Sequence, residues 1–412
     1  MIANIKPPLF PIVAYFTSDF SDPIITDIGM VDEDIPGFID SKSKEISDLE
    51  MKINEFCQSY GITPESIFYL FDVGFSVEIT QEKILSLEND EFIGFLEDDI
   101  KLQSGPSSTK SKPRMQGGKP RMQGNKPRMQ DGNIVSFLEP YNSQFNTSCA
   151  IILSGGPVSN QDSRRIWVLD TGIDGNHPDL NLNRIHSRSF PSSLGNPLVD
   201  NNGHGTHCAG IAAARSTNGN MYGMNGISMG AELISLKILN DCGIGKYSYL
   251  LLALDYVIVN RKQGDVVMLC LGGYDPELSF DTDNPISKRI TILCEIRKVF
   301  VAMSAGNDYG DANLNFPGSF SYPAKAVTVA ALDFNCHYVT GFAPYSNFGT
   351  CAKWAAPGSN IYSTLPNNDY GYMSGTSMAC ALVAGIIHAR NDLPSYQEYI
   401  TYQGQDYKIP HL

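Results

Sequence analysis

Apolar residues in the first hundred positions follow a strand period in some places and a helix period in others. Residues 9–17 form a mostly apolar run that predicts a first strand. Between residues 42 and 60, apolar side chains recur at helical spacing, which predicts an amphipathic helix that ends before Gly61. The elements that follow are predicted in the same way: one or two strands over 67–79, a helix over 81–89 and a strand over 92–96. This order of elements is the split β-α-β plan.

Three further segments join an apolar run to a polar group. Residues 165–170 predict a buried parallel strand whose carboxyl end presents Asp170, and active sites assemble at that edge of doubly wound sheets. A helix is expected to begin at His204 and to run to residue 214. Another helix is expected over 378–390, which places the hydroxyl of Ser377 at a helix N-terminus, where negative charge is favoured.

Charge divides the chain into three parts. Residues 1–103 hold 21 acidic and 6 basic residues, residues 104–132 hold one acidic and seven basic residues, and the whole chain of 412 residues has a net charge of −14. The basic part repeats Lys-Pro-Arg-Met-Gln three times, and its regular Pro and Gly residues exclude helix and strand, so we predict a flexible linker. We therefore expect a domain over 1–103, a linker over 104–132 and a second domain over 133–412. Seven charges without aromatic side chains favour no specific nucleic-acid partner.

Signals for secretion and for the membrane are absent from the sequence. It holds no run of about 18 apolar residues, so we expect no spanning helix and no membrane partner. Its first 16 residues show no small-residue cleavage pattern after the apolar run. The nine cysteines are odd in number and scattered, which favours mostly free thiols in an intracellular, reducing compartment, with Cys294 and Cys336 as apolar filler. Secretion by another route stays open.

Four separated motifs supply the groups that acyl transfer at a peptide carbonyl requires. They are Asp-Thr-Gly at 170–172, His-Gly-Thr-His at 204–207, Ala-Gly-Asn at 305–307 and Gly-Thr-Ser-Met-Ala at 375–379. In this order they resemble the subtilases, a family of serine proteases. The resemblance implies an α/β fold with a doubly wound, mostly parallel sheet and helices on both faces. It also implies that the first domain, a small α+β ferredoxin-like unit, is a propeptide that assists folding and inhibits the enzyme.

The resemblance also implies a role for each polar group. Ser377 would attack the scissile carbonyl, His204 would take its proton and Asp170 would orient the imidazole. The side-chain amide of Asn307 would stabilise the oxyanion together with the backbone N–H of Ser377. His207 is expected to be structural, because the family uses the first histidine of this motif.

Substrates of the family add a strand between two segments of the enzyme. The segments that match are Gly243, Ile244 and Gly245 on one side and Leu271, Gly272 and Gly273 on the other. Ala305, Gly306 and residues 316–318 are expected to wall the first specificity pocket. We expect a sizeable apolar or neutral residue before the scissile bond, although Asp308 at the rim also tolerates a basic one. The resemblance further implies a cis peptide bond between Phe316 and Pro317.

One metal site and one reactive thiol also follow from the resemblance. Asp179 matches a calcium ligand of many subtilases, and the Asn218 amide in the loop 216–223 would complete an oxygen-rich site; the alternative is a hydrogen-bonded loop. No cofactor is expected for the chemistry itself. Cys208 follows His204 by four residues, as in the proteinase K-like branch, so its thiol should lie under the imidazole and confer sensitivity to mercurials.

The leading interpretation is therefore a monomeric serine endopeptidase that acts on polypeptides, is made as a self-processed zymogen and is inhibited by its own propeptide. The Met-Gln steps of the repeats are candidate maturation sites. Two departures from the family pattern weaken the interpretation as an active enzyme. Ala381 stands where the family usually has proline, with Leu382 after it, and only 35 residues follow Ser377. The alternative is a catalytically silent scaffold with the same fold, and an acyl-transferring ligase or esterase is a third possibility.

Overall fold

The computed structural model describes most of the chain and divides it into two units. The described residues are 9–18, 20, 21, 23, 37, 39, 41–70, 72–99, 101–105, 141–159, 162–216, 223–276 and 284–412. The first unit comprises residues 1–101 and 246–260, and the second comprises residues 102–245 and 261–412. The basic repeats, including the candidate maturation sites, lie outside the described residues, so the proposed linker and the domain limits stay predictions.

The first unit contains the α+β sheet that the hydrophobic pattern predicts. Four antiparallel strands lie in the order β2-β3-β1-β4, as the split β-α-β plan requires. Apolar side chains of the sheet and of the amphipathic helix α2 share one core, which includes Leu49, Ile53 and Phe75. The elements of this unit are β1 (Phe10–Phe16), α2 (Ser43–Ser59), β2 (Ser66–Phe68), β3 (Gly74–Ile79), α3 (Gln81–Glu88), β4 (Ile93–Asp98) and α6 (Tyr247–Asn260).

A buried carboxylate holds the start of helix α6 within this first unit. Asp99 accepts hydrogen bonds from the backbone N–H and the hydroxyl of Ser248, each at 2.9 Å. Nearby, the Lys246 ammonium contacts Glu65 at 2.7 Å and Glu78 at 3.0 Å. Burial raises the pKa of Asp99 to about 6, even though the Ser248 hydrogen bonds and Lys246 oppose the rise. The carboxylate is therefore well bonded but poorly hydrated.

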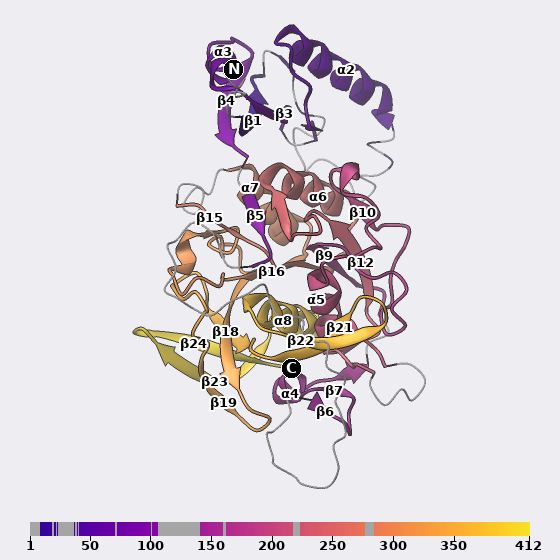
Figure 1. The fold of residues 1–412 in the computed structure, drawn as a ribbon, viewed down its shortest axis with the longest axis vertical. Coiled ribbons are helices and arrows are strands. Elements are labelled where there is room, and N and C mark those ends of the chain that lie inside the picture. Colours follow the sequence, from indigo (N-terminus) through magenta and orange to yellow (C-terminus); the bar gives the residue numbers. More distant parts are fainter. Residues whose placement is uncertain are drawn as a thin grey trace, which may run out of the picture. The chain divides into compact units, whose positions relative to one another are not determined.

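The second unit is built on a mostly parallel sheet (Figure 1). Its strand order is β10-β12-β9-β14-β16-β18-β20-β24-β23, with β19 beside β18. β9 pairs in parallel with β12 and β14, and all six of its residues are buried, as expected for a central strand of an α/β sheet. The strands of this sheet are β9 (Arg165–Asp170), β10 (Arg188–Ser189), β12 (Glu232–Lys237), β14 (Val266–Leu269), β16 (Phe300–Ser304), β18 (Ala326–Phe334), β19 (Val339–Phe342), β20 (Trp354–Pro357), β23 (Ser395–Tyr402) and β24 (Gln405–His411).

Two central helices cover one face of this sheet. The α5 and α8 helices pack against each other and share a core with apolar residues of β9, β14, β16 and β18 (Figure 1). The helices of the second unit are α4 (Cys149–Leu153), α5 (His204–Ala213), α7 (Pro285–Thr291), α8 (Thr376–Arg390), the short turns η1 (Ser192–Leu194) and η4 (Ala312–Leu314), and the π-helical η3 (Ile292–Ile296). Its short strands are β6 (Tyr141–Asn142), β7 (Thr147–Ser148), β8 (Val158–Ser159), β11 (Ser228–Met229), β15 (Gly273–Tyr274), β17 (Asn315–Phe316), β21 (Ile361–Leu365) and β22 (Asp369–Met373). Two more short strands, β5 (Lys101–Gln103) and β13 (Ile244–Lys246), contain a residue at which the chain passes from one unit to the other. The predicted α/β fold and the predicted start of a helix at His204 are confirmed, whereas the helix predicted over 378–390 begins two residues earlier, at Thr376.

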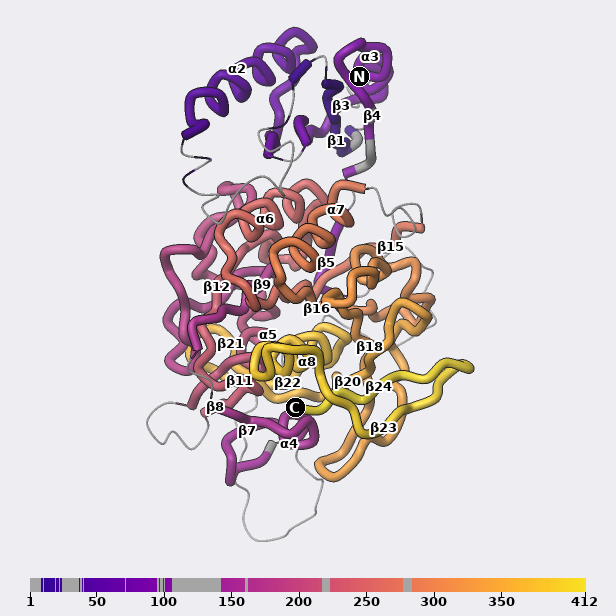
Figure 2. The backbone as a smooth tube through the Cα atoms, turned by 180° about the vertical axis from the view of Figure 1, so that it is seen from behind, coloured from indigo at the N-terminus to yellow at the C-terminus, as the bar shows by residue number. Residues whose placement is uncertain are grey.

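The short C-terminal segment completes the sheet. After α8 the chain returns as the antiparallel hairpin β23–β24, and β24 joins β20 in parallel (Figure 2). Tyr407 of β24 is fully buried, and the backbone N–H of Leu412 donates to the carbonyl of Ser154 at 2.9 Å. The β23–β24 hairpin therefore forms one edge of the sheet.

One cysteine expectation is wrong. Cys149 and Cys336 form a disulfide, so Cys336 is not a free apolar filler. The pairing was not visible in the sequence because 187 positions separate the two residues. The other seven cysteines are free thiols, as expected for most of the nine, and Cys242 is the exposed one among them. No helix in the described ranges combines the length and the apolar character of a membrane span.

Candidate active site

The end of β9 and the start of α5 bring an aspartate and a histidine together. Asp170 is the last residue of β9, His204 is the first residue of α5, and both are buried. His204 Nδ1 lies 2.8 and 2.9 Å from the two carboxylate oxygens of Asp170. This contact needs Gly205, because a Cβ atom there would lie 2.1 Å from the carbonyl oxygen of Gly172. Burial opposes charge on the imidazole, but the Asp170 carboxylate outweighs it and raises the pKa of His204 to about 9.

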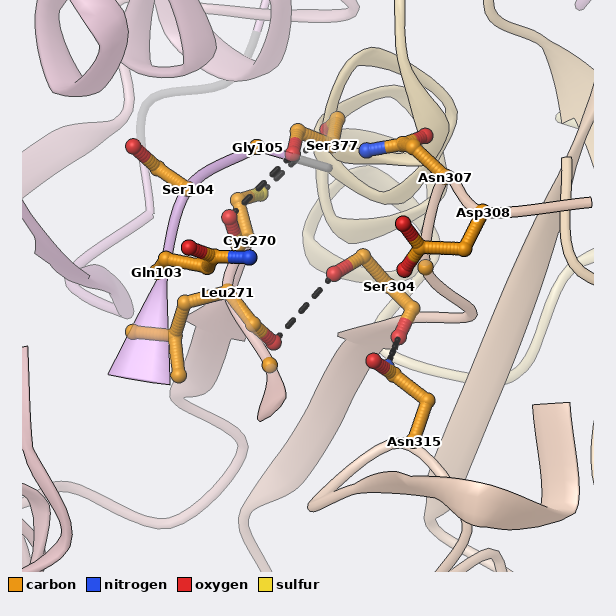
Figure 3. Close-up of a pocket in the computed structure, with 12 residues that line it drawn as sticks. Gln103, Ser104, Gly105, Cys270, Leu271, Ser304, Asn307, Asp308, Asn315 and Ser377 are labelled. Atoms are coloured by element: carbon orange, nitrogen blue, oxygen red, sulfur yellow. Dashed lines mark hydrogen bonds between the residues drawn. The ribbon is translucent and has the colours of Figure 1, made fainter. Parts of the chain in front are cut away.

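Ser377 lies in the first turn of α8, as its sequence motif predicts. Its hydroxyl donates to the carbonyl oxygen of Cys270 at 3.1 Å, as the dashed line in Figure 3 shows. Among the described residues, no hydrogen bond joins the Ser377 hydroxyl to the His204 ring. A hydroxyl turns about a single Cα–Cβ bond, and catalytic hydrogen bonds in substrate-free enzymes are often formed only when substrate binds.

Asn307 is held with its amide nitrogen toward Ser377. Its Oδ1 accepts from the backbone N–H of Thr376 at 2.8 Å and from the Thr376 hydroxyl at 3.0 Å. The oxygen is thereby fixed, and the Nδ2 atom points to the Ser377 side chain (Figure 3). An amide donor fixed in this way is suited to a negative charge that develops beside the serine.

Two backbone segments near Ser377 already pair with an extended strand of the same unit. The backbones of Gln103 and Gly272 exchange two hydrogen bonds, of 3.0 and 3.1 Å, in an antiparallel bridge. The N–H of Ser104 donates to the carbonyl of Gly243 at 3.1 Å. Gly243 has φ of 74°, and a Cβ atom there would lie 2.5 Å from Ser104 Oγ, so the close approach requires glycine.

The remaining residues predicted for the cleft have different surroundings. Ile244 and Gly245 lie in β13, which pairs with β5, and Leu271 lines the pocket beside Ser377. Gly306 also lines this pocket, whereas Ala305 is fully buried behind it. Gly273 pairs with Phe316 in the β15–β17 ladder rather than with the extended segment. The cis bond between Phe316 and Pro317 is confirmed.

Sequence reasoning missed two polar residues of this pocket. Ser304 and Asn315 line it at the side away from Ser377 (Figure 3). Asn315 directly precedes the segment 316–318 that was expected to form a wall, so its place in the sequence could have indicated a pocket residue. That its side chain turns into the pocket depends on the pairing of β17 with β15, which the sequence does not show.

Comparisons with known proteins agree with this geometry. The model of the subtilase family matches residues 163–399. The chain belongs to the subtilase family. It is 34% identical over 233 residues to an intracellular serine protease of Paenibacillus polymyxa, a match that covers 54% of this chain and 65% of that protein. Against the major intracellular serine protease of Bacillus subtilis (strain 168) the identity is 33% over 240 residues, which cover 57% of this chain and 69% of that one.

A solved structure is similar in its fold. It is a cold adapted subtilisin-like serine proteinase, with a TM-score of 0.50 and 25% identity over 62% of this chain and 91% of the other. The chain spans about two thirds of the length of the first intracellular relative and 53% of that of subtilisin E from Bacillus subtilis (strain 168). The family match begins at residue 163, so residues 1–162 lie outside it.

Three buried thiols lie beneath the active site of this subtilase. Cys208 Sγ is 4.0 Å from both ring nitrogens of His204, and Cys270 Sγ donates to the backbone carbonyl of Ser377 at 3.2 Å. Burial disfavours the thiolate of Cys270, but hydrogen bonds from the thiols of Cys208 and Cys380 outweigh this and hold its pKa below the ordinary value. The predicted position of Cys208 under the imidazole is confirmed.

The second histidine of the motif has a structural position. His207 Nε2 faces the carbonyl oxygens of Ile361 at 3.0 Å and Gly371 at 3.2 Å, which belong to β21 and β22. Burial, reinforced by the neighbouring charge of His204, lowers the pKa of His207 to about 3. This histidine is therefore neutral, and it joins α5 to a hairpin.

Asp179, the expected calcium ligand, is engaged by hydrogen-bond donors. Its Oδ2 accepts from the backbone N–H of Met224 at 2.9 Å and from the Tyr370 hydroxyl at 2.7 Å. The second expected ligand, Asn218, lies outside the described residues. Within the described ranges, the donor atoms of three metal-binding side chains converge only at Asp170, His204 and Cys208.

Proposed function

We propose that this chain is a serine endopeptidase that hydrolyses peptide bonds in polypeptides through Asp170, His204 and Ser377. The observation that carries the proposal is a run of short contacts that links the bonded Asp170–His204 pair to Ser377 through Cys208 and Cys270. Cys208 Sγ lies 4.0 Å from the His204 ring, and Cys270 Sγ donates to the Ser377 carbonyl at 3.2 Å. The Ser377 hydroxyl, at a helix N-terminus, and the fixed amide of Asn307 lie beside each other at one pocket (Figure 3). The names of the relatives, which are serine proteases, support the same activity.

The roles of the side chains follow from their contacts. When substrate displaces the Ser377 hydroxyl from the Cys270 carbonyl, the hydroxyl turns to His204, gives up its proton and bonds to the scissile carbonyl carbon. Asp170 keeps Nδ1 of His204 protonated, so that Nε2 is free to accept the proton of the Ser377 hydroxyl. This proton then passes from Nε2 to the leaving amine. Asn307 Nδ2 and the Ser377 backbone N–H donate to the oxyanion. Water, activated by His204 in the same way, then attacks the acyl carbon, which releases the acyl group and returns the proton to Ser377.

We also propose that the chain is a zymogen with residues 1–103 as its propeptide, 104–132 as linker and 133–412 as catalytic domain. The contacts of residues 102–105 support this arrangement. Gln103 and Ser104 bond to Gly272 and Gly243 as a substrate strand would, and Gly105 lines the pocket beside Ser377. The propeptide would thus act as an intramolecular inhibitor of a monomeric enzyme.

The proposed chemistry needs no cofactor, because protein side chains supply the base, the nucleophile and the oxyanion donors. A structural calcium ion at Asp179 and Asn218 is supported by the family resemblance, but the hydrogen bonds of Asp179 favour the alternative of a hydrogen-bonded loop. An intracellular location has the support of two relatives' names and of seven free thiols. The disulfide between Cys149 and Cys336 stands against it.

The test compares the wild-type chain with Ser377→Ala. A fluorophosphonate probe should label the wild type at residue 377 and leave the variant unlabelled, and mass spectrometry should show self-cleavage in the wild type alone. A Ser359→Ala chain is the matched control and should behave as wild type. Absence of both labelling and cleavage in the wild type, also after limited trypsin has opened the chain after Arg114, Arg121 and Arg128, would identify the chain as the silent scaffold. Faster aminolysis than hydrolysis of peptide esters would identify a ligase.

A further inference from the structure

Three buried thiols, Cys208, Cys270 and Cys380, form a row with Cys270 in the middle. Cys208 belongs to α5, Cys270 directly follows β14 and Cys380 belongs to α8, so three separate elements bring them together. The thiols of Cys208 and Cys380 both donate hydrogen bonds to the Cys270 sulfur. Among the described residues, the three sulfur atoms do not gather as ligands of one metal ion. The row therefore offers neighbouring pairs of sulfur atoms rather than a metal site.

The protons of this row are held by its outer members. Burial, reinforced by the neighbouring sulfur of Cys270, raises the pKa of Cys208 and that of Cys380 well above the ordinary value. Burial also disfavours the thiolate of Cys270, but the two hydrogen bonds that it accepts outweigh burial and hold its pKa below the ordinary value. Because the thiolate is the form of cysteine that attacks an electrophile, Cys270 is the nucleophile of the row.

Cys270 is also the member of the row that lines the pocket beside Ser377 (Figure 3). It is 1% exposed, whereas Cys208 and Cys380 are fully buried. A thiolate in such a place reacts only with a small oxidant. Hydrogen peroxide is little larger than water and meets this condition, whereas glutathione disulfide does not. A thiolate at a pocket with a second thiol beside it is the usual arrangement of a cysteine that senses peroxide.

The pair formed by Cys208 and Cys270 contacts both catalytic residues. Cys208 Sγ lies 4.0 Å from both ring nitrogens of His204. In its thiol form Cys270 donates to the Ser377 carbonyl at 3.2 Å, and its own carbonyl accepts from the Ser377 hydroxyl at 3.1 Å. A disulfide draws its two sulfur atoms to about 2.05 Å, well inside contact distance. Since the core is close-packed, this bond would displace His204 relative to Ser377.

We propose that Cys270 is an oxidation site at which hydroperoxides switch the protease off, by closing a disulfide between Cys270 and Cys208. The effect on activity rests on the proposed function, whereas the formation of the disulfide does not. Cys208 rather than Cys380 is the partner, because its thiol contacts the His204 ring, which takes up the proton that the attacking sulfur loses.

The reaction balances in two steps. First, the Cys270 thiolate attacks one oxygen of hydrogen peroxide, so that an S–O bond forms, the O–O bond breaks, and the hydroxide that leaves takes up a proton to become water. Next, Cys208 gives its proton to His204 and its sulfur attacks the Cys270 sulfur. The S–S bond forms as the S–O bond breaks, and the departing hydroxide takes the proton from His204 as a second water. The two cysteines lose two electrons, which reduce the peroxide.

The first experiment uses the Ser377→Ala chain, so that its result does not depend on proteolysis. Limited trypsin opens the chain within residues 104–132 and is then blocked, because the segment 103–105 lines the same pocket as Cys270. After hydrogen peroxide and alkylation of the remaining thiols, mass spectrometry of peptides should show a disulfide between Cys208 and Cys270. Reduced Cys270, a disulfide to Cys380, or a sulfinic acid at Cys270 without a disulfide would each overturn the inference.

The second experiment measures loss of kcat/KM in the opened active chain. Every chain carries Met378→Leu, because the thioether next to Ser377 is another target of peroxide. Peroxide should lower kcat/KM at least tenfold, in step with the disulfide. Cys270→Ser removes the nucleophile and keeps a hydroxyl donor, and it should retain at least half of its own untreated value.

Cys294→Ala is the matched control, because it removes a buried free thiol in η3 whose pKa is raised by burial. It should lose activity as the Met378→Leu chain does. Equal loss in Cys270→Ser would overturn the switch while the proposed function stands. If Cys270→Ser does not fold, the peptide map of the Ser377→Ala chain decides. Absence of activity before peroxide is added would overturn the proposed function, and the same map would still decide whether the disulfide forms.

Discussion

The role proposed for Asn307 can be tested with a variant that removes its hydrogen-bond donor and keeps its hydrogen-bond acceptor. Asn307→Asp has nearly the same shape and retains an oxygen for the backbone N–H and hydroxyl of Thr376, which the native residue accepts at 2.8 and 3.0 Å. It loses the Nδ2 donor that points to Ser377 (Figure 3). Asn307→Ala removes both functions and serves as the comparison.

The expected magnitudes differ between catalysis and stability. Loss of one oxyanion donor lowers kcat by about 10²–10³, or ~2.7–4 kcal/mol, a range measured for a subtilisin. KM should change little, because the donor acts on charge that is present only in the transition state. Stability should fall mainly in Asn307→Ala, which leaves the two Thr376 donors without a partner at about 1–3 kcal/mol.

The assay pairs peptide hydrolysis with thermal unfolding. Asn307→Asp should show a kcat at least 100-fold below wild type and should unfold near the wild-type temperature. Asn307→Ala should show a similar loss of kcat and a lower unfolding temperature. A kcat for Asn307→Asp within tenfold of wild type would refute the assignment, and a rise in KM with unchanged kcat would make Asn307 a substrate-binding residue instead.

Four more outcomes are expected. Pro106→Ala should allow self-cleavage after Gly105, seen by mass spectrometry, because Gly105 lines the pocket beside Ser377 and an ordinary peptide bond then replaces the bond to proline, which has no N–H; an unchanged set of fragments would contradict this. In the opened enzyme, kcat/KM should rise with pH through a pKa above 6.5, because Asp170 stabilises the charged His204 that must first become neutral; a rise complete below pH 6.5 would be contrary evidence. Because the pKa of Asp99 is raised in the folded chain, its contribution to stability is full below its ordinary pKa and is lost as pH rises through about 6. The unfolding temperature of the Ser377→Ala chain should therefore fall between pH 5 and 7. Adding Asp99→Asn to that chain should abolish the part of the fall that Asp99 causes. Mercuric chloride should inhibit wild type at least ten times more strongly than Cys208→Ala, while Cys242→Ser, which lacks the exposed thiol, should stay as sensitive as wild type.

Local patterns predicted the parts of the structure that local forces determine. The amphipathic spacing of residues 42–60 gave α2, and the apolar run at 165–170 gave β9, because burial of one face or of a whole strand leaves a regular trace in the sequence. The position of His204 at a helix start followed from its flanking glycines. The contact of Cys208 with the imidazole followed from helical geometry.

Contacts between distant strands left no such trace. The disulfide from Cys149 to Cys336 and the hydrogen bond from Ser377 to Cys270 both depend on how separate segments meet. The same holds for Asn315, which turns into the pocket only because β17 pairs with β15. The sequence identified the wall beside it, 316–318, from a motif, but a motif carries no information about the depth of a pocket.

The shape of the pocket and the sequence of the segment in the cleft are consistent with each other. Gly105 lines the pocket beside Ser377, and Gln103 and Ser104 are held by backbone hydrogen bonds to Gly272 and Gly243. A segment that fitted so well would be cleaved quickly if an ordinary residue followed it. Pro106 follows Gly105 in the sequence, and a bond to proline lacks the N–H of an ordinary peptide bond. On the proposed function, the segment that holds Gln103, Ser104 and Gly105 therefore blocks the cleft until the propeptide leaves it.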